Sequence, residues 1–142
     1  MLLFYFSISL TILSNALYHV VQKSTPGTVN PALALAVTYA TAAVVCLALL
    51  PFFPLRSGFV QSLRELNWAS YALAFTVVGL ELGFLLAYRA GWNISLGAIV
   101  SNVAVTLLLV PVGLLLFREK MSLVNLTGIA VCILGLVLIN HK

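Results

Sequence analysis

The fold is decided by the stretch from Gly79 to Asn102, GLELGFLLAYRAGWNISLGAIVSN, which contains one acidic residue in an otherwise apolar run. That residue is Glu81; the other two acids, Glu65 and Glu119, lie beside basic residues in polar connections. A carboxylate at the centre of a lipid bilayer costs roughly 2.5–3.5 kcal/mol on insertion scales. We therefore expect Glu81 to have a partner, a water-filled cavity or a bound proton.

The composition around this stretch is that of an integral membrane protein. Of the 142 residues, 63% are hydrophobic and only 7% are charged, against about 25% charged residues in soluble domains. The net charge of +4 comes from scattered Lys and Arg residues, which are typical of loop anchors and not of a nucleic-acid-binding surface. We predict a multi-pass protein of the cell (plasma or inner) membrane, with the lipid bilayer as its surroundings.

Five apolar runs are long enough to cross a bilayer, which takes about 20 helical residues at a rise of 1.5 Å each. They cover about residues 2–22, 32–50, 69–88, 94–117 and 122–140. None alternates as a transmembrane barrel strand does. The first run has no basic start and exceeds a typical signal-peptide core, so we count it as a helix. The sequence predicts an all-α integral membrane protein with five transmembrane helices in a single domain, residues 1–142.

Polar residues recur at helical spacing in the first run. They are Ser7, Thr11, Asn15, Tyr18, His19 and Gln22. Spacings of 4, 4, 3, 1 and 3 place them on one helical face. In lipid, such a face must turn toward protein or water. Hydrogen bonding between helices and lining of a substrate path explain this polar stripe equally well.

The third run places two further candidates beyond Glu81. Tyr88 follows Glu81 at i+7 on the same face, and Arg89 follows at i+8. Glu81 and Arg89 are about 12 Å apart along the helix axis, too far for a direct pair within one helix. Arg89 is either a residue that extends to the membrane interface or part of a site. Glu81 is either a structural carboxyl group or a substrate and proton site.

The connections and the fourth run carry weaker signals. Asn30 followed by Pro31 predicts a helix start. Residues 55–67 are expected to include a short helix on the bilayer surface. In the fourth run, Asn102 and Thr106 follow Ser95 at spacings of 7 and 4 and form a second polar stripe. Further along this run, Pro111 is expected to kink the helix.

The last run has a face of small residues. Gly128, Cys132 and Gly135 recur at spacings of 4 and 3, and such faces let helices approach closely. They predict a packing or dimer seam without chemistry. Cys46 and Cys132 lie in apolar runs without metal-ligand spacing, so we expect both to be reduced, packed residues.

The distribution of basic residues barely favours one orientation. Five spans would place the termini on opposite sides of the membrane. One side carries Arg56, Arg64, Arg118 and Lys120, and the other carries Lys23, Arg89 and Lys142. The positive-inside rule needs a clear excess, so the chain either has its N-terminus inside by a weak preference or inserts both ways. Insertion both ways would permit an antiparallel homodimer with inverted-repeat symmetry.

Residues 94–140 carry a family resemblance; their sequence is ISLGAIVSNVAVTLLLVPVGLLLFREKMSLVNLTGIAVCILGLVLIN. A small polar helix start, a long apolar helix, a short Arg-Glu-Lys connection and a Gly-rich last helix follow one another. In this the whole chain resembles one copy of the EamA-like five-helix unit of the drug/metabolite transporter superfamily. The same region is similar to the last two helices of small multidrug resistance exporters. There, a Gly-to-Gly heptad, matched here by Gly128 and Gly135, mediates dimerisation.

The resemblance implies a secondary transporter of small organic molecules. EamA-like proteins typically carry two such units in opposite orientations, so this unit is expected to pair with a second copy or an oppositely oriented paralogue. The chain departs from the small multidrug exporters in one respect. Their coupling glutamate lies in the first helix, where this chain has Asn15 and His19 and no acid. Proton coupling is therefore not carried over with the resemblance.

Our leading hypothesis is a homodimeric transporter with a cavity lined by the first, third and fourth predicted helices. Glu81 would alternately bind a proton or a cationic or polar substrate. Hydrogen bonds would come from Tyr88, Asn15, His19 and Asn102. The full set of candidate substrate or coupling residues is Glu81, Tyr88, Asn15, His19, Asn102, Thr106 and Arg89.

The alternative is a non-transporting membrane subunit or scaffold, in which the polar stripes only join helices and a partner protein does the work. An enzyme is not expected. The sequence has no Ser-His-Asp set, no cluster of metal ligands and no Gly-rich phosphate loop. For the same reason we expect no metal and no cofactor, and the scattered basic residues indicate no nucleic-acid partner.

Overall fold

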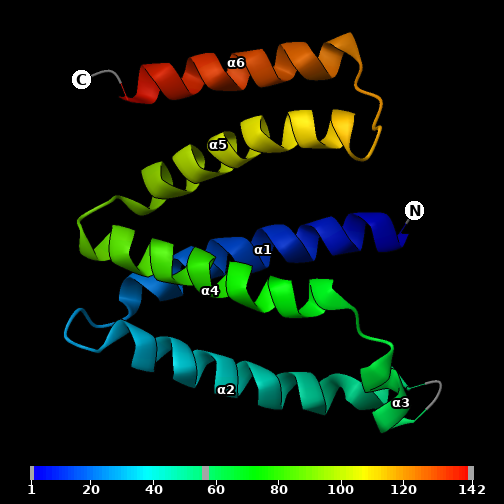
Figure 1. Cartoon of the computed structure of the whole chain (residues 1–142). Coiled ribbons are helices and arrows are strands. Elements are labelled where there is room, and N and C mark those ends of the chain that lie inside the picture. Colours follow the sequence, from blue (N-terminus) through cyan, green and yellow to red (C-terminus); the bar gives the residue numbers. More distant parts are fainter. Residues whose placement is uncertain (1, 56–57, 141–142) are drawn as a thin grey trace. The chain divides into compact units, whose positions relative to one another are not determined.

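The computed structural model describes residues 2–55 and 58–140, with the side chains of Leu136, Ile139 and Asn140 left out. Arg56 and Lys142, two of the cations in the predicted charge bias, lie outside the described residues. The described part is helical and contains no strand. The long helices are α1 (Leu2–Ser24), α2 (Pro31–Leu49), α4 (Trp68–Arg89), α5 (Ile94–Leu115) and α6 (Leu123–Asn140), and the short ones are η1 (Leu50–Phe52) and α3 (Phe59–Arg64) (Figure 1).

Four of these elements are long and apolar enough to cross a membrane: α1, α2 together with η1, α4, and α5. The prediction of a multi-pass, all-helical membrane protein is confirmed to that extent, and the bounds agree with the predicted runs to within two residues. The remaining long helix, α6, is not among these four candidate spans. A fifth span therefore stays a prediction. The short helix expected within residues 55–67 is α3.

Contacts divide the chain into two compact units, Met1–Gly91 and Trp92–Lys142. In the first unit, α4 packs against both α1 and α2. Among the described residues α1 and α2 do not pack on one another, so α4 is the element that joins the unit (Figure 1). In the second unit, α5 packs against α6. One domain over residues 1–142 stays a prediction.

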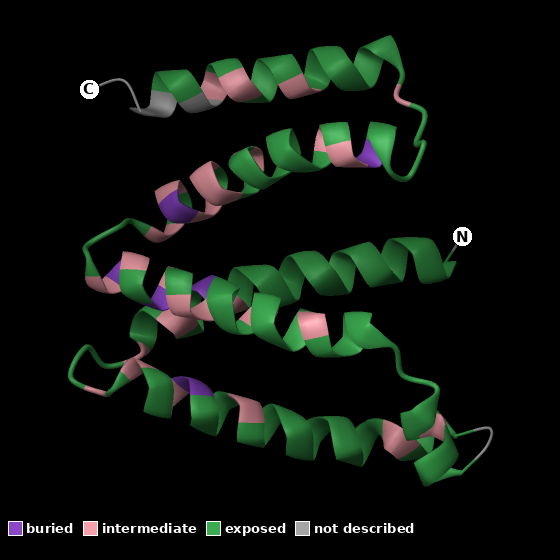
Figure 2. Ribbon diagram, viewed as in Figure 1, coloured by how far each residue is buried: buried purple, intermediate pink, exposed green. Residues whose placement is uncertain are grey.

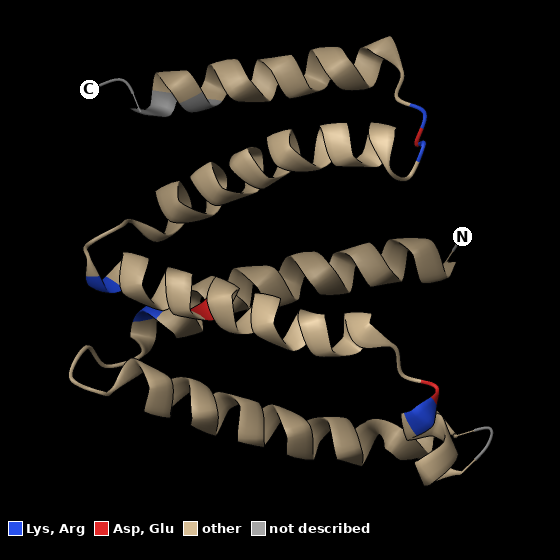
Figure 3. Ribbon diagram, in the orientation of Figure 1, with Lys and Arg blue, Asp and Glu red and all other residues tan. Residues whose placement is uncertain are grey.

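In the first unit the few buried side chains lie on α4 and on the helices α1 and α2 that pack against it, and in the second unit α5 has two buried glycines, Gly97 and Gly113 (Figure 2). Leu85 is only 2% exposed, and Leu35, Tyr88 and His19 are the other buried side chains of the first unit. By contrast, large apolar side chains are exposed along every long helix, as Phe75 is at 80%. Because lipid tails solvate such a surface, helix association here depends on packing and hydrogen bonds. Charged residues lie at helix ends and connections, except for the acid inside α4 (Figure 3).

Asparagine caps set the start of two membrane helices. The Oδ1 atom of Asn30 accepts hydrogen bonds from the backbone N–H of Ala32 at 2.9 Å and of Leu33 at 3.3 Å. With Pro31 in the first turn, this confirms the predicted helix start at Asn30. Asn67 caps α4 in the same way, through the backbone N–H of Ala69 at 2.9 Å. These caps satisfy N–H groups that the helix itself leaves unpaired.

The connection from α5 to α6 folds back on the end of α5. The helix continues through Pro111 to Leu115, and the expected kink stays a prediction. Arg118 adopts a left-handed backbone conformation, with φ at 51°, and the N–H of Glu119 donates to the carbonyl oxygen of Gly113 at 3.0 Å. A Cβ at Gly113 would lie 2.5 Å from the Oε2 atom of Glu119. Only glycine therefore permits the carboxyl group of Glu119 to lie against the helix at this point.

Replacing the cap residue should destabilise the protein. We expect Asn30→Ala to lower the free energy of unfolding by about 1 kcal/mol, because the N–H groups of Ala32 and Leu33 lose their acceptor. Unfolding in a titration with sodium dodecyl sulfate, followed by circular dichroism, measures this change. Asn93→Ala is the matched control, because Asn93 precedes α5 without making a side-chain cap. Equal losses in the two variants would contradict the role of the cap.

Candidate functional site

A buried hydrogen bond joins α1 to α4. The Nδ1 atom of His19 lies 2.7 Å from the hydroxyl oxygen of Tyr88, and the histidine tautomer decides which of the two groups donates. His19 is 5% exposed and Tyr88 is 7% exposed. The bond brings together two predicted site residues that are 69 positions apart in the chain. A polar pair of this kind replaces the water that neither group can reach within a bilayer.

Phe84 provides an aromatic wall beside this pair. Its ring stacks on Tyr88, with centroids 5.9 Å apart and an interplanar angle of 26°. The same ring meets His19 edge-on at 4.7 Å and Tyr18 edge-on at 5.9 Å. Such offset and edge-on arrangements are the favourable geometries for aromatic pairs. They limit the freedom of the His19 and Tyr88 rings and keep the hydrogen bond between them in place.

Glu81 lies about two turns before Tyr88 and nearer the middle of α4. Residues of three helices meet around it. From α1, the Nε2 atom of Gln22 donates to the backbone carbonyl oxygen of Glu81 at 2.7 Å. The carboxyl group of Glu81 interacts electrostatically with Tyr18 of α1 and Tyr39 of α2, and its interaction with Tyr39 includes a weak side-chain hydrogen-bonding contribution. Glu81 itself is partly buried. We call this set the Glu81 cluster; its members are Tyr18, His19, Gln22, Tyr39, Glu81 and Tyr88.

Two hydroxyl groups of the Glu81 cluster make no well-formed hydrogen bond within the described part of the chain. They belong to Tyr18 and Tyr39, and both oxygen atoms are buried. A buried polar group without a partner costs about 1–3 kcal/mol. Since the Tyr88 hydroxyl is paired with His19, the Tyr39 hydroxyl interacts with Glu81 and the Tyr18 hydroxyl is unpaired, the cluster retains capacity for a further hydrogen bond at Tyr18.

Arg89 fixes the end of α4 to the connection between α1 and α2. Its Nη2 atom donates to the carbonyl oxygens of Pro26 at 3.1 Å and Val29 at 2.9 Å. Arg89 therefore binds backbone carbonyls and not the carboxyl group of Glu81, as their separation along the helix predicts. Lys23 lies on the same end of the unit, with its Nζ atom 5.7 Å from the centroid of the Tyr88 ring.

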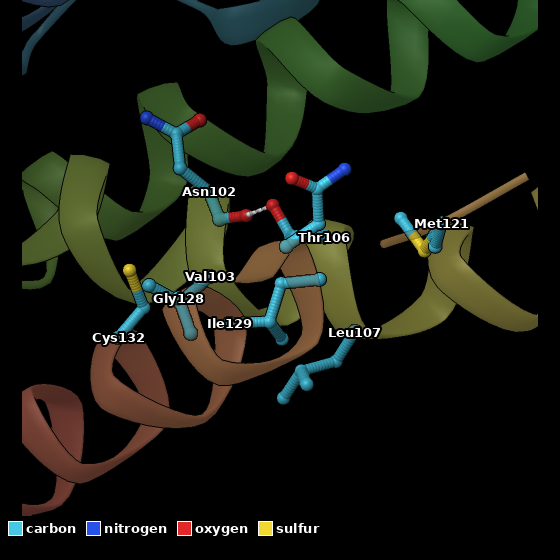
Figure 4. Close-up of a pocket in the computed structure, with 9 residues that line it drawn as sticks. Asn102, Val103, Thr106, Leu107, Met121, Gly128, Ile129 and Cys132 are labelled. Atoms are coloured by element: carbon cyan, nitrogen blue, oxygen red, sulfur yellow. Dashed lines mark hydrogen bonds between the residues drawn. The ribbon is translucent and has the colours of Figure 1, made fainter. Parts of the chain in front are cut away.

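Asn102 and Thr106 lie in the second unit, on α5. They line a pocket of about 440 Å³ together with residues of α6 that include Gly128, Ile129 and Cys132 (Figure 4). The hydroxyl of Thr106 donates to the carbonyl oxygen of Asn102 at 2.8 Å, so it is satisfied within its own helix. The cavity expected between the first, third and fourth predicted helices stays a prediction.

The polar stripe of α1 divides into two parts. The hydroxyls of Ser7 and Thr11 donate to carbonyl oxygens of the preceding turn, each at 3.0 Å. Asn15 is exposed and does not belong to the Glu81 cluster. Among the described residues, only the end of the stripe, with His19 and Gln22, makes hydrogen bonds to another helix. Hydrogen bonding between helices and lining of a substrate path thus remain the two explanations for the end with His19 and Gln22 alone.

The small-residue face of α6 is open. A Cβ added to Gly128 or Gly135 would meet no atom of the described residues within 4 Å, so α5 does not approach α6 closely at these glycines. The dimer seam stays a prediction. Cys46 and Cys132 are free thiols, as expected, but both are exposed. Packing of the two thiols stays a prediction, and Cys132 lines the pocket between α5 and α6.

Sequence reasoning did not place Tyr18, Gln22, Tyr39 or Phe84 in the site. Tyr18 and Gln22 belong to the α1 stripe, which was the available signal. Nothing singled out Tyr39, because the polar residues of α2 form no stripe at helical spacing. In the described ranges no three His, Cys, Asp or Glu residues come together as a metal site would require.

Comparison with known proteins adds no relative. No protein-family model matches the chain, and neither a curated protein nor a solved structure matches it. Membership of the drug/metabolite transporter superfamily therefore stays a prediction. The function has to be argued from the Glu81 cluster.

The His19–Tyr88 bond should appear as a coupling energy. In a double-mutant cycle with His19→Ala and Tyr88→Phe, we expect a coupling of about 0.6–1.7 kcal/mol, the range found for hydrogen bonds between membrane helices. Detergent unfolding of the four proteins in mixed micelles measures it. Tyr71→Phe replaces Tyr88→Phe in the control cycle, since Tyr71 is exposed. A coupling as small as that of the control would mean that the bond is absent in the membrane.

Proposed function

We propose that this chain is a secondary transporter of small organic molecules or metabolites, and that it works as a dimer. The observation that supports this is the environment of Glu81. Its carboxyl group lies among three apolar helices, beside the buried hydroxyl of Tyr39, which interacts with it, and the buried hydroxyl of Tyr18, which has no hydrogen-bond partner in the described structure. Polar groups of this kind are costly in a membrane, and they typically mark substrate or ion pathways.

The chemistry of the Glu81 cluster favours a cationic or polar substrate. A carboxylate accepts hydrogen bonds and attracts a positive charge, whereas a phenol hydroxyl both donates and accepts. An ammonium or hydroxyl group bound here would neutralise Glu81 and pair the hydroxyls of Tyr18 and Tyr39. A proton on Glu81 is the alternative occupant. Exchange of the two occupants would couple substrate movement to proton movement.

A single five-helix unit lacks the oppositely oriented second unit of a complete transporter, and a dimer would supply it. We propose that α6 is the fifth span and that the chain is an EamA-type unit, which pairs with a second copy or a paralogue in the opposite orientation. The open face at Gly128 and Gly135 fits such a seam, because small residues let two helices approach closely.

A second candidate function is a membrane subunit without transport activity. One observation favours it: the His19–Tyr88 bond and the bond from Gln22 to the Glu81 carbonyl are complete without any ligand. These contacts act as interhelical hydrogen bonds in either case. The two candidate functions differ in their use of Tyr18 and Tyr39: a substrate binds their hydroxyls in the transporter and none does in the subunit. A stable complex with another protein after mild extraction, unaffected by small molecules, would favour the subunit.

Neutralising Glu81 should abolish transport without unfolding the protein. We expect Glu81→Gln to reduce transport of the best substrate from a panel of radiolabelled cationic and polar compounds by about tenfold or more, as the loss of a charge-assisted interaction does. Vesicles containing the purified protein provide the measurement, and circular dichroism checks folding. Glu65→Gln is the control, because Glu65 lies between α3 and α4, outside the apolar helices. Full transport by Glu81→Gln would remove this residue from the mechanism.

The antiparallel dimer makes a prediction about orientation. Because Lys and Arg residues are almost evenly divided between the two sides, we expect a C-terminal reporter readable on each side of the membrane to give signal on both sides of intact cells. Signal on one side only would contradict an antiparallel homodimer. It would leave an oppositely oriented paralogue as the partner to be sought.

A further inference from the structure

A second pocket lies at the end of the first unit, where α1 and α4 terminate. It has a volume of about 180 Å³, and its walls include Gln22, Lys23, Thr25, Tyr88 and Arg89. Pockets for drug-sized ligands are larger, at about 300–1,000 Å³. This pocket therefore fits a single small group and not a whole organic substrate.

The charge of this pocket is positive. Among the described residues that line it are two cations, Lys23 and Arg89, and no Asp or Glu. Lys23 is positioned by the face of the Tyr88 ring, which attracts a cation electrostatically. A hydroxyl from Thr25 adds a neutral hydrogen-bonding group to the wall. An anion is the ligand that such a lining favours.

Arg89 adds a donor that the protein leaves without an acceptor. The two bonds from its Nη2 atom to Pro26 and Val29 fix the guanidinium group at the pocket. Its Nε atom is buried and has no hydrogen-bond partner within the described chain. Guanidinium N–H groups form charge-assisted hydrogen bonds to phosphate or carboxylate oxygens; since both Nη2 hydrogens are used by Pro26 and Val29, Nε–H is the single donor to be satisfied here. An oxyanion in the pocket would satisfy the donor that remains.

The expected position of the pocket in the membrane favours phosphate among the oxyanions. Lys23 is in the last turn of α1, and Arg89 is in the last turn of α4. The ends of two membrane spans lie at the level of the polar headgroups, and basic pockets between membrane helices bind lipid phosphates there. We propose that the pocket between Lys23 and Arg89 binds a phosphate group, from a lipid headgroup or from a soluble phosphate ester. This site does not depend on transport by the Glu81 cluster.

Thermal unfolding of the purified full chain in an uncharged detergent tests the phosphate site. Phosphatidic acid is the lipid probe, sn-glycerol 3-phosphate is the soluble probe, and diacylglycerol is the lipid without phosphate. We expect at least one phosphate probe to raise the unfolding temperature and diacylglycerol to leave it unchanged. A response to phosphatidic acid alone assigns the site to a lipid headgroup. A response to sn-glycerol 3-phosphate assigns it to a soluble ester.

Variants distinguish phosphate binding in this pocket from a general attraction of phosphate to cations on the protein surface. In Lys23→Gln, the concentration of phosphate probe for a half-maximal response should rise by about tenfold or more. Arg89→Lys keeps the charge but loses the Nε–H donor and the bonds to Pro26 and Val29 that fix the group at the pocket, so it should also weaken the response. Lys120→Gln, in the exposed connection before α6, is the control and should respond as the unmodified protein does. No response to either probe, an equal effect of diacylglycerol, or an unchanged response in Lys23→Gln would overturn the proposal.

Discussion

The hydrogen bond between His19 and Tyr88 is the interaction on which the first unit depends. Helices in lipid gain little from hydrophobic association, because lipid tails are as apolar as their side chains. A buried bond of 2.7 Å between α1 and α4 therefore fixes both the rotation and the depth of one helix against the other. With that register set, Gln22 reaches the carbonyl oxygen of Glu81 and Tyr18 lies beside its carboxyl group.

Different contacts bring α2, the third long helix of this unit, next to the Glu81 cluster. Arg89 holds the connection between α1 and α2 through two carbonyl oxygens, and Asn30 caps the helix that follows. Packing of α2 against α4 then places Tyr39 near Glu81. The side chain of Asn30 and the Nη2 atom of Arg89 are thus paired within the protein, whereas the hydroxyl of Tyr18 is not. This contrast separates the part of the cluster that packs helices from the part that has capacity for a ligand.

Sequence reasoning was most successful where one physical rule decides the outcome. Apolar length defined the long helices, and the Asn30–Pro31 pair marked the start of α2. Periodicity placed His19 and Gln22 on one face of α1, but a face does not identify its partner. Tyr39 was not predicted as a site residue, because α2 has no polar stripe. Asn15 was predicted as one because it lies on the stripe of α1, although it is exposed. Partner choice depends on three-dimensional packing, which the spacing of residues does not contain.

Solid-state nuclear magnetic resonance in lipid bilayers tests the central contact most directly. The full chain would carry ¹⁵N-labelled histidine and ¹³C-labelled tyrosine, with Tyr88→Phe to assign the signal. We expect a through-space correlation between the Nδ1 atom of His19 and the Cζ atom of Tyr88, because a hydrogen bond of 2.7 Å holds these atoms close. The correlation should disappear in Tyr88→Phe. A His19 signal that correlates with water and not with tyrosine would contradict the packing of α1 on α4 and the position of Glu81 derived from it.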